Sequence, residues 1–231
     1  MLLITGASGF LGGHIVSECI DMEPLTPSHK ELDLLSLASV KTYLKKNNVS
    51  KIIHAAGFVG GIGLHVNHPG RVAMENLRMG ANIIEAAAHN GNIRLVNIST
   101  VCIYPANAAI PISESSAHLG YPAEDTAYYG IAKKTLHVLA CAMADEFGLS
   151  HVTIVPTNMY GPGDHYDEEK SHVVPALIKR AHEAKLSLEP SMIVWGDGLQ
   201  IRDLLYAPDC AKWIRRALES DINNEMINFG S

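Results

Sequence analysis

Residues 2–16 have the sequence LLITGASGFLGGHIV, which predicts a strand, a glycine-rich turn and a helix in succession. A short apolar run, typical of a buried strand, is followed by three glycines spaced three apart, Gly6, Gly9 and Gly12, and then by a helix-type segment. Glycine lets the backbone approach a pyrophosphate, and the start of the helix offers unpaired N–H groups and a partial positive charge. The stretch predicts a cradle for dinucleotide phosphates, and a tight strand-to-helix turn without a ligand is the alternative.

The rest of the chain repeats this alternation of strand and helix. Strand-type runs lie at 2–5, 51–54, 94–98, 151–155 and 226–229. Helix-type segments lie at 12–21, 36–46, 71–89, 126–147, 172–184 and 207–219. The order predicts an α/β fold with a doubly wound parallel sheet, in which ligands bind outside the carboxyl ends of the strands. Because no repeat, low-complexity tract or linker interrupts residues 1–231, we expect a single domain.

The composition argues against several classes of protein. Of the 231 residues, 47% are hydrophobic and 18% are charged, which suits a globular domain. The formal net charge is −6 and Lys and Arg form no run, so we expect a small-molecule substrate, without nucleic-acid binding or a polybasic membrane patch. The first apolar residues are too few for a signal peptide or a membrane span, which predicts a cytoplasmic protein.

The spacing of cysteine and histidine gives no sign of a metal site. The four cysteines are widely scattered, so we expect reduced thiols and no zinc or redox motif. His65 and His68 are three apart, but no set of acidic or cysteine partners accompanies them. We interpret both histidines as polar loop residues and expect no metal.

Residues 126–137, TAYYGIAKKTLH, contain two adjacent tyrosines and two adjacent lysines. Tyr129 and Lys133 are four apart, so they share one face of a helix. A phenol beside an ammonium is a known acid arrangement, because the positive charge lowers a tyrosine pKa that starts near ~10. A solvated helix face with a chance pairing is the alternative.

Together with HAAG at 54–57 and NISTVCIYP at 97–105, these motifs resemble the extended short-chain dehydrogenase/reductase family of NAD-dependent epimerases and dehydratases. The resemblance implies a Rossmann fold and a catalytic set of Thr100, Tyr129 and Lys133. Tyr129 would pass a proton to a carbonyl oxygen that Thr100 also hydrogen-bonds, while a nicotinamide delivers hydride to the carbon. Lys133 would bind the nicotinamide ribose and lower the tyrosine pKa, which leaves Tyr128 and Lys134 as bystanders.

Further segments between about residues 52 and 209, such as PTNMYGPGDHY at 156–166 and VWGDGLQIRDLLYAPD at 194–209, are similar to the GDP-L-fucose synthase group of that family. The similarity implies conversion of GDP-4-keto-6-deoxy-mannose to GDP-L-fucose, by 3,5-epimerisation and then 4-keto reduction. Epimerisation needs an acid/base pair, which maps onto Cys102 as base and His172 as acid. Cys102 lies two residues after Thr100, so on a strand both side chains point to the same side. A buried apolar cysteine and a capping or surface histidine are the alternatives.

The segment EPLTPSHKELDLL at 23–35 bears on the choice of cofactor. Ser28, His29 and Lys30 suit a 2′-phosphate better than a carboxylate does, so we expect NADP, with NAD as the alternative. Asp33 would accept a hydrogen bond from the adenine amino group or would cap the following helix. The cofactor contacts that we expect are Gly6, Ser8, Gly9, Phe10, Leu11, Gly12, His29, Asp33, Leu34, Ala55, Ala56, Gly57, Lys133, Pro156, Asn158, Met159 and His172.

The resemblance also implies residues for substrate binding. Arg180 and Arg202 would grip the GDP diphosphate, because guanidinium presents a planar fork to phosphate oxygens. Trp195 and Asn158 would line the nucleotide-sugar pocket. A solvated helix face for Arg180 and core packing for Trp195 are the alternatives. Family members continue past the final strand, so we expect the small substrate lobe, inserted around 157–203, to be truncated.

Two other functions remain open on the sequence. A UDP-hexose 4-epimerase or another nucleotide-sugar reductase would keep Thr100, Tyr129 and Lys133 but would have no use for Cys102 and His172 as a pair. A catalytically silent NADP-binding regulator would have no need of the Tyr129 and Lys133 spacing. The presence of all five residues favours the epimerase/reductase.

Two predicted helices carry apolar residues around much of their circumference. These are 71–89, with MGANIIEAAA, and 126–147, with LHVLACAMA. One face of each should pack on the sheet, and a second apolar face could pair with another subunit. The resemblance implies a homodimer through a four-helix contact, and helices buried within a monomer are the alternative.

Overall fold

The computed structural model describes residues 1–167, 171–194 and 196–230. Its centre is a five-stranded parallel sheet in the order β1-β2-β3-β4-β7. The strands are β1 (Leu2–Thr5), β2 (Lys51–His54), β3 (Arg94–Ile98), β4 (Ser150–Pro156) and β7 (Glu225–Phe229). All five were predicted from apolar runs, and the first three match at both ends. Such runs form strands here because both faces of the sheet are covered, so successive side chains are buried on either side.

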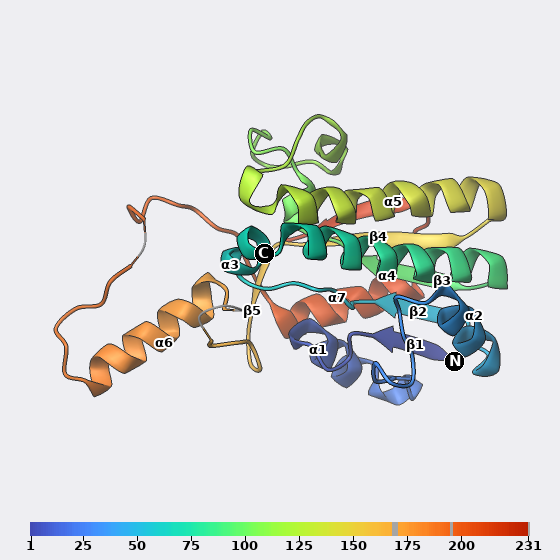
Figure 1. The fold of residues 1–231 in the computed structure, drawn as a ribbon, viewed down its shortest axis with the longest axis horizontal. Coiled ribbons are helices and arrows are strands. Elements are labelled where there is room, and N and C mark those ends of the chain that lie inside the picture. The colour runs from blue at the N-terminus through green and yellow to red at the C-terminus, as the bar shows by residue number, and fades with distance from the viewer. Residues whose placement is uncertain (168–170, 195, 231) are drawn as a thin grey trace.

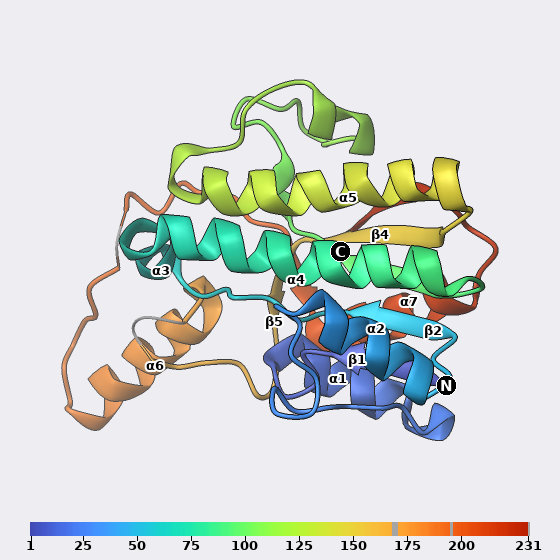
Figure 2. The same cartoon turned by 45° about the vertical axis from the view of Figure 1, so that its right-hand side comes forward.

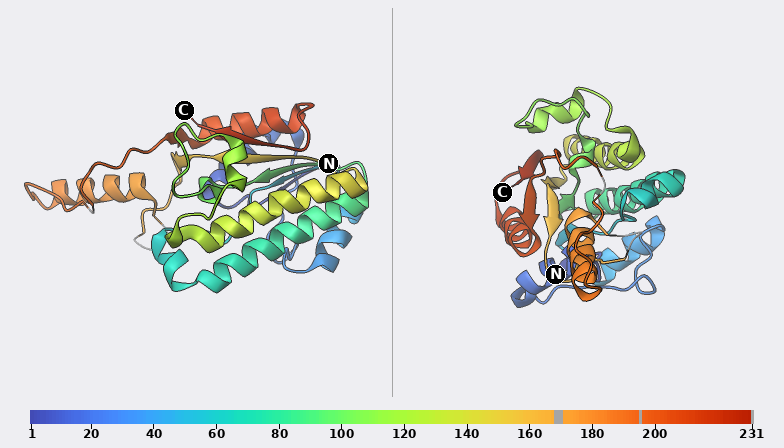
Figure 3. Two further views of the ribbon diagram at one scale, coloured as in Figure 1. Left: turned by 90° about the horizontal axis from the view of Figure 1, so that it is seen from above. Right: turned by 90° about the vertical axis from the view of Figure 1, so that its left-hand side faces the viewer.

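Helices cover both faces of the sheet, which confirms the doubly wound prediction (Figures 1, 2 and 3). One layer holds α2 (Leu37–Lys46), α4 (Pro69–Asn90) and α5 (Ala127–Phe147), and the other holds α1 (Phe10–Glu18) and α7 (Ala207–Glu219). The left panel of Figure 3 shows the sheet between the α4/α5 layer and α7. Each layer encloses its own hydrophobic cluster, with Leu3, Ile52 and Leu95 facing the first and Ile4, Ile53 and Val96 facing the second.

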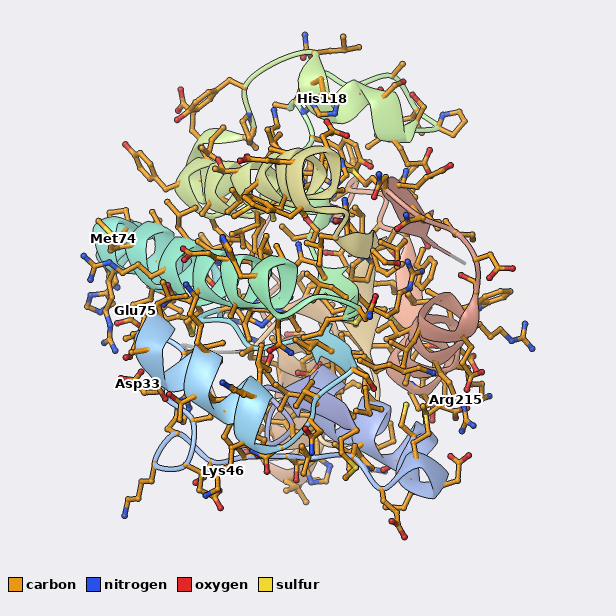
Figure 4. All side chains as sticks on the ribbon, turned by 90° about the vertical axis from the view of Figure 1, so that its right-hand side faces the viewer. Asp33, Lys46, Met74, Glu75, His118 and Arg215 are labelled. Atoms are coloured by element: carbon orange, nitrogen blue, oxygen red, sulfur yellow. The ribbon has the colours of Figure 1, made fainter. Side chains whose placement is uncertain are left out.

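Close helix contacts hold each layer together. In the first layer, Gly80 of α4 lies so near α5 that a Cβ atom there would stand 2.2 Å from Cδ1 of the buried Leu136. In the second layer, Arg215 of α7 donates two hydrogen bonds of 2.7 Å to the Asp21 carboxylate, just beyond α1 (Figure 4). The first contact depends on a missing side chain and the second on an exposed ion pair, so substitution of Gly80 should be the more disruptive.

Residues 23–35, at the sheet edge beside β1, form no strand. A single bridge pairs Leu3 with Leu25, and the chain then turns toward α2. Asp33 does not cap α2, which corrects one of its two predicted roles. Its carboxylate accepts a hydrogen bond of 2.9 Å from the Leu35 N–H, while the Ser36 hydroxyl caps the helix by accepting from Ser39. Figure 4 shows Asp33 and Lys46 near opposite ends of α2.

Short elements that the sequence did not predict lie at the carboxyl edge of the sheet. After β2 comes α3 (Ile62–Asn67), and after β3 come three 3₁₀ turns, η2 (Val101–Ile103), η3 (Glu114–His118) and η4 (Glu124–Thr126). A further turn, η1 (Ile20–Met22), follows α1. The segment with η3 lies over α5, where Figure 4 labels His118.

A small second sheet carries an arm that projects from the main body. It pairs β5 (Asn158–Tyr160) with β6 (Leu204–Tyr206) in parallel. Between these strands α6 (Val173–Leu186) extends away from the five-stranded sheet (Figures 1 and 3). His14 of α1 bonds the Pro162 carbonyl at 2.9 Å and so ties the start of the arm to the main body. Within the described residues, every helix is too short or too polar to cross a membrane.

Candidate functional site

The glycine loop after β1 is built by two close backbone approaches. Gly6 has φ of 72°, and a Cβ atom there would lie 2.6 Å from the Ala56 nitrogen at the end of β2. A Cβ atom on Gly12 would lie 1.9 Å from the Gly6 carbonyl oxygen. The helix that follows starts at Phe10, and Gly9 at its N-cap has no side chain to occupy the first N–H groups. The loop therefore offers a bare helix N-terminus at the carboxyl edge of the sheet, which suits an anionic phosphate.

The other predicted cofactor residues surround this loop or lie further along the same edge. Ser8 and Gly57 are exposed, and Ala55 and Ala56 are half-buried beside the loop, where the Ala56 N–H donates to the Thr5 hydroxyl at 3.3 Å. Leu11 and Leu34 belong to the two hydrophobic clusters, so only their backbone atoms are free to face a ligand. Pro156 ends β4, and Asn158 and Met159 begin β5.

The turn at 28–31 contains an acidic side chain, Glu31, that was not among the predicted cofactor residues. The Glu31 carboxylate accepts hydrogen bonds of 2.8 Å from both the N–H and the hydroxyl of Ser28. These two bonds hold the pKa of Glu31 below its usual range. Ser28 is thus already engaged at the place where His29 and Lys30, both exposed, were predicted to meet a 2′-phosphate.

The two tyrosines and two lysines at the start of α5 differ in their surroundings. Tyr129 and Lys133 are 8% and 4% exposed, whereas Tyr128 is 58% exposed. Lys134 donates a hydrogen bond to the Gly120 carbonyl in the segment that covers α5. The buried pair points toward the sheet edge, because the charge of Lys133 reaches His54 at the end of β2. The solvated helix face that was the alternative for Tyr129 and Lys133 is therefore wrong.

Burial controls the proton affinities in this pair. It lowers the pKa of Lys133 to about 8, since an ammonium is costly to hold away from water. Burial also raises the pKa of Tyr129, and the charge of Cys102 adds to the rise. The spacing predicted a lowered tyrosine pKa, but the pKa of Tyr129 is raised, because the phenol is buried away from water.

Thr100 and Cys102 lie on a turn and not on a strand. β3 ends at Ile98, and the Thr100 hydroxyl caps η2 by accepting a hydrogen bond of 3.2 Å from the Cys102 N–H. The argument that both side chains point to one side of a strand is therefore wrong. The turn nevertheless carries Cys102 to the start of α5, where a Cβ atom on Gly130 would stand 2.0 Å from the Cys102 carbonyl oxygen. The turn that carries Thr100 and Cys102 therefore packs on the helix that carries Tyr129 and Lys133.

His65 was predicted to be a polar loop residue, and this is wrong. It lies on α3, is 8% exposed, and its ring centroid is 5.2 Å from that of Tyr129. His172 is exposed and occupies the N-cap position of α6 without a capping hydrogen bond from its side chain, and its charge lowers the pKa of His65. The arm therefore brings His172 to the surroundings of Tyr129. The glycine-rich sequence before His65 gave no helical pattern, and the apolar residues Ile62 and Val66 of α3 are themselves exposed.

The predicted substrate residues lie on the arm. Arg180 of α6 donates to the Ile193 carbonyl at 3.4 Å, and Arg202 donates to the Ile201 carbonyl at 3.1 Å. The Asn158 amide donates to the Asp203 carbonyl at 3.4 Å and so links β5 to the start of β6. Trp195 lies outside the described residues. Arg180 therefore lies within α6 and Arg202 on the connection from α6 to β6, and α6 extends away from α5 (Figure 1).

Comparison with known proteins gives consistent matches over the whole chain. The model of the NAD dependent epimerase/dehydratase family matches residues 2–230. A GDP-L-colitose synthase of Yersinia pseudotuberculosis is 37% identical over 216 residues, which are 92% of this chain and 70% of the relative. A GDP-L-fucose synthase of Sinorhizobium fredii is 37% identical over 231 residues, 99% of this chain and 73% of the relative. The structure of a GDP-L-fucose synthetase from Naegleria fowleri bound to NADP superposes with a TM-score of 0.87 at 25% identity, and the match covers 100% of this chain and 76% of that one.

Proposed function

The chain belongs to the NAD dependent epimerase/dehydratase family, and we propose that it is a nucleotide-sugar epimerase/reductase of the GDP-L-fucose synthase group. The proposed reaction converts GDP-4-keto-6-deoxy-mannose to GDP-L-fucose with NADPH. The observation that carries the proposal is the burial of Tyr129 and Lys133 against the turn that bears Thr100 and Cys102. A regulator without activity would have no use for this arrangement, and a simple 4-epimerase would have no use for Cys102 beside it.

In the proposed reduction, bound NADPH supplies a hydride to C4 of the sugar. Tyr129 donates its proton to the C4 oxygen, and the Thr100 hydroxyl donates a hydrogen bond to the same oxygen as negative charge develops. The raised pKa of Tyr129 suits a group that must hold a proton until the oxygen becomes basic. Lys133 binds the ribose hydroxyls of the cofactor and stabilises the tyrosinate that remains, until solvent returns the proton.

In the proposed epimerisation, the 4-keto group acidifies the protons on C3 and C5. Cys102 as thiolate removes one such proton, the charge passes to the C4 oxygen, and His172 returns a proton to the opposite face of the ring. Tyr129 and Thr100 stabilise the enolate, since they already face that oxygen. The position of Cys102 beside Tyr129 supports this division, because base and oxyanion donors must meet on adjacent atoms of one substrate.

Substrate and cofactor would bind on opposite sides of the proposed catalytic residues. The glycine loop with Ala55, Ala56 and Gly57 would hold NADP, and the structure of the NADP-bound relative supports that choice over NAD. Arg180, Arg202 and Asn158 would bind the GDP portion. Their place on the arm supports this, since α6 begins with His172 and leads outward from the sugar site.

We propose a homodimer through α4 and α5. The two helices lie side by side in the outer layer (Figures 1 and 2), and they expose the apolar side chains of Met74, Tyr128 and Val138. A measured solution mass of a monomer would contradict this pairing.

The deciding experiment follows nicotinamide absorbance after mixing the protein, NADPH and GDP-4-keto-6-deoxy-mannose. We expect NADPH loss that Tyr129→Phe reduces by at least about 10³-fold and that the matched control Tyr128→Phe leaves unchanged. In deuterated water, the wild type should incorporate deuterium at C3 and C5, and Cys102→Ala should not. Cofactor that binds without being consumed would refute the reductase, and NADPH loss without exchange would refute the epimerase.

A further inference from the structure

His65 is a buried imidazole that the proposed reaction does not use. It belongs to the short helix α3, which packs on η4 directly before the start of α5. From this place its ring meets the ring of Tyr129 at a centroid separation of 5.2 Å and an angle of 50°. The contact is made by two side chains that are 8% exposed each, so the imidazole covers one side of the phenol ring.

Two further neighbours define the state of His65. The backbone of Gly60 hydrogen-bonds the ring and favours its protonated form, as a carbonyl acceptor does. Burial acts more strongly in the other direction, and the charge of His172 adds to it, so the pKa of His65 lies below its ordinary value. At neutral pH the ring is therefore uncharged and is fixed by Gly60 on one side and by Tyr129 on another.

We infer that His65 is a positioning residue that fixes the phenol ring of Tyr129 and connects it with His172. The inference rests on the proposed function, in which these two residues donate protons to one sugar ring. The positive charge of His172 disfavours a proton on His65, and so adds to the burial that keeps the ring beside Tyr129 uncharged. The two donors are thus linked through a residue that touches one of them.

Other ionisable groups near α3 have to be separated from this effect. Glu124 and Asp125 lie on η4, which packs on α3. On α4, which follows α3, Arg71 pairs with Glu75 at 2.7 Å and stacks over the ring of Phe58. The charge of Cys102 also acts on Tyr129 and raises the pKa of the phenol. His68, three residues from His65, is exposed and provides a matched control for the loss of an imidazole.

The first test measures no turnover, so its result does not depend on whether the proposed function is correct. Ring carbons of histidine and tyrosine are labelled, and the ligand-free protein is titrated by NMR. We expect the Tyr129 signal, assigned with Tyr129→Phe, to move with the titration of His65, and His172→Asn to raise the His65 pKa. The inference is overturned if the Tyr129 chemical shift stays constant while His65 titrates, or if His172→Asn leaves the His65 pKa unchanged. The double variant Glu124→Gln, Asp125→Asn is the control that separates the effect of the two carboxylates.

The second test separates ring placement from folding through the rate of NADPH loss. His65→Ala should lower kcat at least about 10-fold with KM changed less than about 3-fold. The reason is that the Tyr129 ring loses its contact with the imidazole while the substrate contacts remain. His65→Phe should restore most of kcat at pH 7, where the imidazole is uncharged, and His68→Ala should match the wild type. The inference is overturned by a normal kcat in His65→Ala, or by losses in both His65 variants that follow their thermal stability alone.

Discussion

Gly130 of α5 and Cys102 of η2 touch through their backbones, because a Cβ atom at position 130 would stand 2.0 Å from the Cys102 carbonyl oxygen. The residue next to Tyr129 thus presses directly on the turn that holds Thr100 and Cys102. The two halves of the proposed active site are therefore fixed to each other by the absence of one side chain.

Gly130→Ala should separate these halves. The clashing atom is backbone, so η2 has to move, and overpacking of this kind costs about 1–3 kcal/mol of unfolding free energy. We also expect NADPH turnover to fall at least about 10-fold, since Thr100 would shift relative to Tyr129 and the two proposed donors to the C4 oxygen would no longer be aligned. Denaturant unfolding and nicotinamide absorbance measure the two effects. Gly70→Ala in α4 is the control, because nothing lies within 4 Å of its added Cβ, and it should change stability by less than about 1 kcal/mol. Equal behaviour of the two variants would disprove the contact.

Cofactor binding should weaken as the pH rises through 8. Burial lowers the pKa of Lys133 to about 8, so the ammonium that would hold the cofactor ribose is present at pH 7 and mostly lost at pH 9. We expect the Kd for NADPH, measured by fluorescence titration, to rise roughly 3- to 10-fold between these values. Lys133→Met should bind weakly at both pH values, without this dependence. A pH slope that survives in Lys133→Met would assign the titration to another group.

The choice between NADP and NAD should respond to Glu31. Its carboxylate occupies the Ser28 donors that a 2′-phosphate needs, and it adds a negative charge at that place. Glu31→Gln keeps the shape and removes the charge, so NADPH should bind roughly 3- to 10-fold more tightly while NADH binding stays constant. Glu23→Gln, exposed and earlier in the same segment, should change neither affinity. If Glu31→Gln leaves NADPH binding unchanged, the 2′-phosphate does not lie at this turn.

The fold should lose stability between pH 6.5 and pH 4. Burial lowers the pKa of His54 to about 3 and the pKa values of His137 and His151 to about 4, with nearby positive charges adding to each effect. In this range the histidines bind protons in the unfolded chain but not in the folded protein. The free energy of unfolding is therefore fully present above pH 6.5 and falls as the pH drops. Each of these histidines should cost about 2 kcal/mol at pH 5.

Urea unfolding at pH 7 and pH 5 measures this loss. His151→Leu should make the pH dependence shallower, since neither ring nitrogen of His151 has a partner among the described residues and its replacement leaves no hydrogen bond unmade. A stability that is equal at the two pH values would contradict the burial of neutral imidazoles.

The sequence was most informative where local pattern and tertiary structure agree. The strand before Gly6 is a short apolar run that ends at a residue with positive φ, so periodicity and turn chemistry predict the same boundary. The face shared by Tyr129 and Lys133 follows from helix geometry alone, and the structure buries that face as a unit. Such features depend on neighbours in the chain.

The features that were missed depend on contacts between distant segments. Cys102 was placed on a strand because its surroundings are apolar, but the Thr100 hydroxyl ends the extended chain by capping a turn. α3 was not predicted because glycines surround it in the sequence. His65 is buried by its contact with Tyr129 of α5, and the residues near position 65 in the sequence could not predict that contact. β5 and β6 are three residues each, too short for a period-two signal to be recognised.

The arm that carries α6 is attached to the main body by a two-stranded sheet and a few hydrogen bonds, such as those from His14 to Pro162 and from Thr157 to Phe229. Hydride chemistry would be performed by residues fixed on the five-stranded sheet and its helices, whereas the sugar nucleotide would be gripped mainly from the arm. In evolutionary terms, tasks divided in this way would change separately. Mutations on the arm would retune which nucleotide sugar is bound while the reductive machinery passed unaltered from one descendant to the next.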